Sequence, residues 1–127
     1  MRRYSRGFTL IELLVVVAII GILSAVGVVS YSVYKSSAEK KQAEITLNSI
    51  YLAEQEYKSN NGEYYYSTST SNLVTNLFDG VDDLSEQSYI FKTTNANTLT
   101  ITATKRTNTS CTISITQTNK KPNVSGC

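Results

Sequence analysis

The stretch Gly7-Phe8-Thr9-Leu10-Ile11-Glu12, followed by the apolar run from Leu13 to Val29, decides the fold of the N-terminal part of this chain. Residues 8–29 carry one charge, at Glu12, and as a helix of about 22 residues they would measure roughly 33 Å. That length crosses a hydrocarbon core about 30 Å thick. Arg2, Arg3 and Arg6 precede the run, so the positive-inside rule keeps this end in the cytoplasm.

Two simpler interpretations of this stretch are a secretory signal peptide and a plain single-pass anchor. A secretory signal peptide has an apolar core of about 7–15 residues, and this run is longer. In addition, no convincing small-x-small cleavage site follows it. Glu12 argues against the plain anchor, because a carboxylate in an apolar span costs a few kcal/mol and is usually paired or functional. A helix packed against copies of itself would satisfy Glu12 if a neighbour supplied a positive charge at the same depth.

The motif Gly7-Phe8-Thr9-Leu10-Ile11-Glu12-Leu13, behind its basic leader, resembles the class III signal of type IV prepilins and their pseudopilin relatives. The continuation over residues 15–23 is similar to the N-terminal helix of type IVa pilins, and the resemblance extends from about Gly7 to Tyr34. It implies that a prepilin peptidase cuts between Gly7 and Phe8 and methylates the new Phe8 amine. It also implies that Glu12 pairs with the Phe8 amine of a neighbouring subunit. Many type IVa pilins carry a kink-forming proline where this chain has Val29, so we expect a straighter helix here.

The resemblance and the periodicity together predict five segments. Residues 1–7 are a removed leader, 8–29 a transmembrane and filament-core helix, and 30–60 an amphipathic continuation of that helix. Residues 61–87 form a connecting loop, with a short helical turn near Asn72 to Phe78, and 88–127 form a sheet with a disulfide-bounded C-terminal loop. An apolar stripe with spacings of three and four supports the amphipathic helix; it consists of Ala43, Leu47, Ile50, Ala53 and Tyr57. Asn60-Asn61-Gly62 is expected to end the helix.

The C-terminal third alternates between apolar and polar residues. Leu99, Ile101 and Ala103 alternate with threonines, and Ile113 and Ile115 continue the pattern in a later segment, which is typical of strands with one buried face. Such a sheet needs a cover for its apolar face. The sequence therefore predicts an α+β fold: a long N-terminal helix packed by its C-terminal half on a three- to four-stranded antiparallel sheet.

Cys111 and Cys127 are the only two cysteines. A domain outside the inner membrane of a diderm cell lies in an oxidising compartment, so we expect a disulfide rather than two free thiols. Closing a loop of about 15 residues stabilises the fold by about 3 kcal/mol in the chain-entropy model. The position of the pair matches the disulfide-bounded C-terminal loop of type IV pilins.

The composition argues against an enzyme. The chain has no histidine, which removes the common metal sites and histidine-based triads, and no base accompanies its many serines and threonines. Asp79, Asp82, Asp83 and Glu86 form an acidic cluster, but its spacing does not match an EF-hand, and we interpret it as a solvated loop. We therefore predict no catalytic residue, no metal and no cofactor.

The predicted function is structural: a pilin subunit of a type IV pilus. The resemblance implies storage in the bacterial inner membrane with a cytoplasmic N-terminus, and then assembly on an inner-membrane platform into an extracellular homo-oligomeric filament with other pilins. Adhesion, twitching motility and DNA uptake follow from the family and not from particular residues. Without the leader the chain has 9 basic against 10 acidic residues, since three of the 12 Lys and Arg precede Gly7, so a globally basic nucleic-acid binder is not indicated.

Two alternatives remain. The first is a DNA-binding minor pilin of the transformation machinery, because a small basic patch near the C-terminal loop would contact phosphates; it would consist of Lys105, Arg106, Lys120 and Lys121. The second is a pseudopilin of a type II secretion system, against which the cysteine pair argues.

Overall fold

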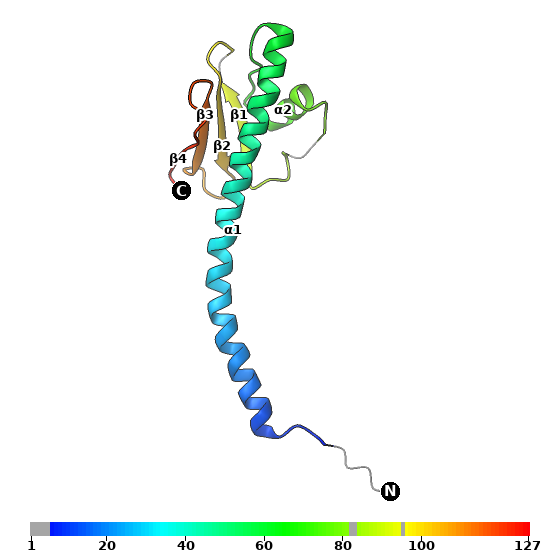
Figure 1. Ribbon diagram of the computed structural model, residues 1–127, viewed down its shortest axis with the longest axis vertical. Helices are drawn as coiled ribbons and strands as arrows, with labels where there is room; N and C mark the ends of the chain where they lie inside the picture. The colour runs from blue at the N-terminus through cyan, green and yellow to red at the C-terminus, as the bar shows by residue number, and fades with distance from the viewer. Residues whose placement is uncertain (1–5, 82–83, 95) are drawn as a thin grey trace. The chain divides into compact units, whose positions relative to one another are not determined.

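The computed structural model describes residues 6–81, 84–94 and 96–127. The chain divides into two compact units, Met1–Ser37 and Ala38–Cys127. Among the described residues the first helix, α1 (Leu10–Asn61), contributes to both units (Figure 1). The second unit adds helix α2 (Thr70–Leu77) and strands β1 (Tyr89–Thr94), β2 (Thr100–Lys105), β3 (Thr112–Thr116) and β4 (Asn123–Ser125).

Helix α1 ends where the sequence predicts. Gly62 has a φ of +84°, a left-handed conformation that glycine adopts without steric cost. Its N–H donates to the Lys58 carbonyl at 2.7 Å, which closes the last turn and satisfies a carbonyl that the helix leaves unpaired. Upstream, α1 continues without interruption through Gly21, Gly27 and Val29. This agrees with the presence of valine, and not proline, at position 29.

The sheet is antiparallel, with the strand order β1-β2-β3-β4. Phe91 lies opposite Ala103, and Ala103 lies opposite Ile113, so the apolar residues of three strands share one row. Along β1, β2 and β3 buried residues alternate with half-buried or exposed ones, as the period of two in the sequence predicts. The short strand β4 pairs with β3 through Thr112–Ser125, Ile113–Val124 and Ser114–Asn123.

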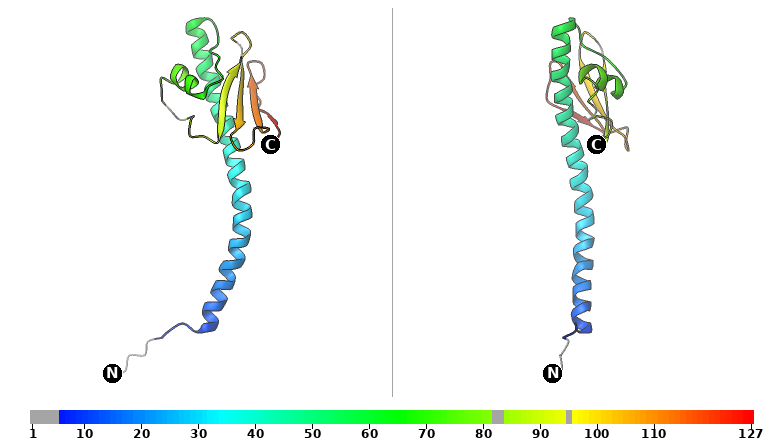
Figure 2. Two further views of the ribbon diagram at one scale, coloured as in Figure 1. Left: turned by 180° about the vertical axis from the view of Figure 1, so that it is seen from behind. Right: turned by 90° about the vertical axis from the view of Figure 1, so that its right-hand side faces the viewer.

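In the second unit, the C-terminal half of α1 covers one face of this sheet (Figure 2). Three residues of the predicted stripe, Ala43, Leu47 and Ile50, have no exposed surface, while Ala53 and Tyr57 are half-buried at the end of the contact. The remaining core residues come from α2, the strands and their connections: Tyr64, Leu73, Val74, Leu84, Tyr89, Phe91, Leu99, Ile101, Ala103, Cys111, Ile113 and Ile115. The predicted α+β fold is confirmed, with four strands in the described sheet.

Helix α2 lies in the segment predicted as a loop with a short helical turn. It forms a regular helix of eight residues, Thr70–Leu77, and buries Leu73 and Val74 against the core. Asp79 and Gly80 follow it with φ values of +53° and +79°, so the chain reverses direction in two left-handed residues.

Candidate functional site

The first turn of α1 contains an interaction that our sequence analysis missed. The Thr9 N–H donates to Glu12 Oε2 at 2.8 Å, and the Thr9 hydroxyl donates to the same oxygen at 2.9 Å. In return, the Glu12 N–H donates to Thr9 Oγ1 at 3.3 Å. This reciprocal arrangement is a capping box, which has the sequence pattern Ser/Thr-x-x-Glu. The spacing Thr9-x-x-Glu12 therefore carried the signal for it.

The capping box determines which carboxylate oxygen of Glu12 can bind a partner. Both of its bonds to Thr9 go to Oε2, so the capping box does not use Oε1. A carboxylate has about four acceptor positions, so Oε1 is available for a cation without loss of the helix cap. Phe8, the residue predicted to carry the processed amine, is 89% exposed beside this turn.

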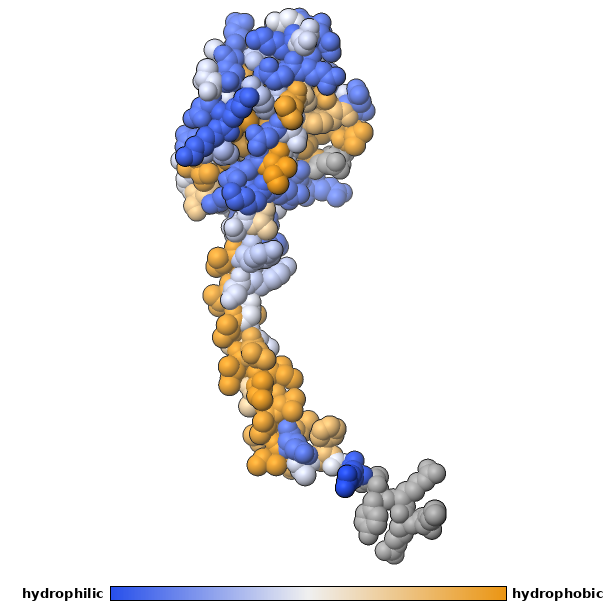
Figure 3. All heavy atoms as spheres, in the orientation of Figure 1, coloured by the Kyte–Doolittle hydropathy of each residue, from blue (hydrophilic) through white to orange (hydrophobic). Residues whose placement is uncertain are grey.

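The N-terminal part of α1 exposes an apolar surface (Figure 3). Every large hydrophobic side chain between Phe8 and Tyr34 is about half exposed or more. Soluble monomers rarely leave such a continuous apolar patch in water, so it marks a contact with lipid or with other proteins. By length and composition, α1 is a helix that can cross a membrane. A shallow apolar depression is lined by Phe8, Ile11, Glu12, Val15 and Val16.

At the other end of the chain, Cys111 and Cys127 form the predicted disulfide, with their Cα atoms 4.4 Å apart. Cys111 is buried directly before β3, and Cys127 follows β4 on the surface. Gly126 is required between β4 and the bridge, since it has a φ of +68° and a Cβ there would overlap with the Ser110 carbonyl group. The bridge and the β3–β4 pairing together hold the C-terminal tail on the sheet.

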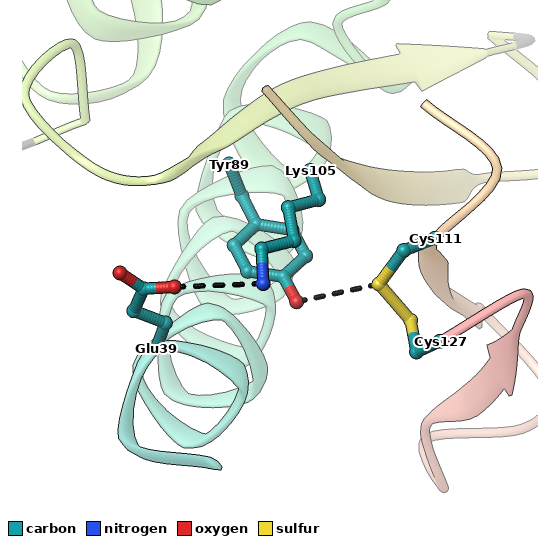
Figure 4. A network of polar contacts seen from close by, with 5 residues as sticks. All are labelled: Glu39, Tyr89, Lys105, Cys111 and Cys127. Atoms are coloured by element: carbon teal, nitrogen blue, oxygen red, sulfur yellow. Dashed lines mark hydrogen bonds and ion pairs between the residues drawn. A yellow bond between two sulfur atoms is a disulfide. The ribbon is translucent and has the colours of Figure 1, made fainter. Parts of the chain in front are cut away.

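A polar network lies beside the disulfide (Figure 4). The Tyr89 hydroxyl is 3.5 Å from Cys111 Sγ, and Lys105 Nζ is 3.7 Å from Glu39 Oε2. Burial, together with the negative charges of Glu39 and Glu44, raises the pKa of the Tyr89 hydroxyl. This environment favours a neutral tyrosine, and the two contacts join β1 to Cys111 and β2 to α1.

The four basic residues predicted to contact DNA fall into two separate pairs. Lys105 ends β2 beside the start of β1, where it pairs with Glu39. Arg106 is the next residue, and its guanidinium donates to the backbone carbonyls of Gln87 and Ser85, each at 2.9 Å. This pair therefore fastens the connection into β1 and contacts α1.

The second pair lies past the opposite end of the sheet. Lys120 and Lys121 follow β3, whose last residue lies opposite the first residue of β2. Lys120 Nζ is 4.9 Å from the centroid of the Tyr51 ring, a cation–π distance, and both Lys120 and Lys121 are exposed. Tyr51 and Glu39 are twelve residues apart on α1, which corresponds to roughly 18 Å. The structure thus does not gather the four cations into one patch, and DNA binding stays a prediction.

The acidic cluster is only partly described. Asp79 and Glu86 are exposed, and Asp82 and Asp83 lie outside the described residues. Within the described part of the chain, Cys, Asp and Glu side chains form no group of three that could hold a metal ion.

Glu54 is a second feature that the sequence analysis missed. It lies on α1, four residues after Ile50 and seven after Leu47, so it falls on the apolar stripe, and its side chain is fully buried. Oε2 accepts the Tyr65 N–H at 2.9 Å, while Oε1 has no hydrogen-bond partner among the described residues. Burial raises the pKa of Glu54 from 4.5 to about 7, against the smaller opposing effect of the Tyr65 N–H. In the sequence, the spacing of Glu54 from Ile50 (i+4) and Leu47 (i+7) was the signal that this residue lies on the buried face of the helix.

Comparison with protein families matches residues 2–28 to the prokaryotic N-terminal methylation motif. Several curated proteins are similar to part of the chain. The type IV major pilin protein PilA of Myxococcus xanthus is 38% identical over 60 residues, which are 47% of this chain and 27% of that protein. The fimbrial protein of Neisseria meningitidis serogroup B is 36% identical over 75 residues, covering 59% of this chain and 44% of the relative.

The type IV major pilin protein PilE of Neisseria gonorrhoeae is 40% identical over 62 residues, covering 49% of this chain and 37% of the relative. The matched regions thus span less than half the length of these relatives. Comparison with solved structures finds no match. The chain carries the methylation motif of type IV prepilins and resembles type IV major pilins.

Proposed function

We propose that this chain is a pilin, the structural subunit of a type IV pilus, and not an enzyme. The observation that carries the proposal is the methylation motif at residues 2–28, most of which lies in the exposed apolar part of α1. The chain also resembles a type IV major pilin and a fimbrial protein. An apolar helix of this length suits storage in a membrane and later burial against other helices.

The chemistry of assembly follows from the first turn of α1. A prepilin peptidase removes residues 1–7, and the new Phe8 amine, once methylated, keeps its positive charge. Glu12 Oε1 of one subunit then accepts the Phe8 amine of a neighbour, while Oε2 keeps the helix cap with Thr9. An ion pair shielded from water by packed helices is screened far less than a surface pair. The sheet units form the outer layer of the filament, and Cys111–Cys127 stabilises that layer outside the cell.

The test is mass spectrometry, under non-reducing conditions, of protein from filaments sheared off the cell surface. We expect an N-terminus at methylated Phe8, and a mass two hydrogens short because of the disulfide. An intact Met1, or cleavage after Val29, would contradict the proposal and indicate a plain anchor or a secreted domain.

A matched pair of variants tests the ion pair itself. Glu12→Gln keeps a side-chain acceptor for Thr9 but loses the charge, so we expect filament yield to fall several-fold while the amount of processed subunit in the membrane is unchanged. Glu56→Gln removes an exposed charge from the same helix and should leave the yield as in the wild type. Equal filament yields from the two variants would refute the role of Glu12.

A further inference from the structure

The buried carboxyl of Glu54 holds a segment of backbone that covers the edge of the sheet. Its only described partner is the N–H of Tyr65, which lies eleven residues away in the connection between α1 and α2. The carboxyl is fully buried, and its second oxygen is unsatisfied. Glu54 therefore holds the start of this connection, at the energetic cost of an unpaired buried oxygen.

The connection held by Glu54 covers the open edge of the sheet. Strand β1 is at the edge, because the strand order is β1-β2-β3-β4. The Thr93 N–H donates to the Ser67 carbonyl at 2.9 Å, and the Thr93 hydroxyl donates to the Tyr65 carbonyl at 3.0 Å. Further along, Thr70 Oγ1 both donates to the Phe91 carbonyl and accepts the Phe91 N–H. Residues 65–70, called the edge segment below, thus occupy the N–H of Thr93 and both backbone groups of Phe91 on the outer side of β1.

Among the described residues, no charged side chain forms an ion pair with Glu54. On α1, Lys58 follows one turn later, but its Nζ lies 4.3 Å from the centroid of the Tyr64 ring. The hydroxyls of Tyr64 and Tyr65 are engaged by Gln55 and Asn76 respectively. From the sheet, the inward residues of β1 and β2 next to the edge segment are uncharged; they are Phe91, Thr93, Ile101 and Ala103. Past β3, Lys120 lies over Tyr51.

We propose that Glu54 is a pH-sensitive latch: its neutral carboxyl holds the edge segment on β1, and its ionisation releases that segment. The physical cause is the cost of burying a charge without a counter-ion. A neutral carboxyl still accepts the Tyr65 N–H through its carbonyl oxygen, and its burial costs far less. An ionised carboxylate gains hydration when the edge segment lifts, so opening becomes more favourable as pH rises.

The size of the effect follows from linkage between protonation and opening. The pKa of Glu54 is about 7 in the closed state, against 4.5 for a hydrated glutamate. The opening equilibrium constant should therefore grow between these two pH values and level off above the higher one, with a total increase of up to about 300-fold. The chain has no histidine, so few other side chains titrate in this interval.

Opening would expose the backbone groups of Phe91 and Thr93. An edge strand with free N–H and C=O groups is a template for pairing with another extended segment. The latch thus links ambient pH to the availability of the sheet edge. It does not depend on whether the chain assembles into filaments.

The experiment is hydrogen–deuterium exchange of the full chain in detergent micelles, between about pH 5 and pH 9, with labelling times scaled to the intrinsic exchange rate at each pH. Peptides that cover residues 64–70 and 89–94 report the edge segment and β1. We compare the wild type with Glu54→Gln, which mimics the neutral carboxyl, and with Glu56→Gln, which removes an exposed carboxylate two residues away.

We expect opening to increase with pH in the wild type and in Glu56→Gln, and to be independent of pH in Glu54→Gln. A ¹³C NMR titration of the Glu54 carboxyl in the wild type provides a second measurement, which stands even if Glu54→Gln does not fold. A titration midpoint near 4.5, or the same pH-dependent opening in Glu54→Gln as in the wild type, would overturn the proposal.

Discussion

Removal of the disulfide should have a large and calculable effect on the second unit. The change Cys127→Ser is the better choice, because Cys127 is exposed whereas Cys111 is almost fully buried. Serine at the exposed position leaves no void in the core, and the thiol of Cys111 stays packed near Tyr89. The variant therefore isolates the loss of the cross-link.

The magnitude follows from the size of the closed loop. The two cysteines are 16 positions apart, and a loop of that length is worth about 3 kcal/mol in the chain-entropy model. For a unit of about 90 residues, each kcal/mol shifts the unfolding temperature by about 4–8 °C, so we expect a decrease of about 12–24 °C. The three residue pairs between β3 and β4 should not compensate, because they form only while the tail is held close.

The assay is thermal unfolding of the full chain in detergent micelles, followed by near-ultraviolet circular dichroism of its nine tyrosines. Reduction of the wild type should reproduce the shift, and reductant should not change Cys127→Ser further. If the unfolding temperature falls by less than about 4 °C, which corresponds to less than about 1 kcal/mol, the reasoning is refuted. That result would show that strand pairing alone holds the C-terminal tail on the sheet.

Three further predictions concern single residues. Gly126→Ala should lower stability by about 1–3 kcal/mol, because its left-handed φ and the adjacent Ser110 carbonyl leave no room for a methyl group; an unchanged unfolding temperature would contradict this. Leu47→Ala should cost about 2–5 kcal/mol in denaturant unfolding, since Leu47 is fully buried. Leu52→Ala is the control, because Leu52 is 67% exposed on the same helix and should change stability by no more than about 0.5 kcal/mol. Glu54 has a folded-state pKa above its usual value, so its contribution to stability is complete below about pH 4.5 and is lost as pH rises to about 7. The stability difference between wild type and Glu54→Gln should therefore change by about 3 kcal/mol over that interval, and a constant difference would speak against a buried ionisation.

Much of the candidate site was open to prediction because the signals are local. The apolar run after Glu12, the stripe that includes Leu47, and the alternation along β2 each reflect the repeat of a helix or a strand. The Thr9-x-x-Glu12 capping box is equally local, and our sequence analysis missed it although the pattern was present. The basic residues were a different case. Their closeness in the sequence suggested one patch, whereas the antiparallel sheet places Lys105 at one end and Lys120 beyond the opposite end.

The sequence by itself determined the helix, the strands, the predicted anchor and the side of each element that is apolar, because those properties depend on residues a few positions apart. Only the tertiary structure decided which surfaces meet. It buried Glu54 against Tyr65, placed the edge segment along β1 through Ser67 and Thr93, and brought Lys105 to Glu39. Such contacts join residues many positions apart, and their energies depend on the burial and dielectric environment that packing creates. The spacing of Glu54 from Leu47 and Ile50 indicates that it lies on the buried face of α1, but only the packed fold creates the environment that raises its pKa.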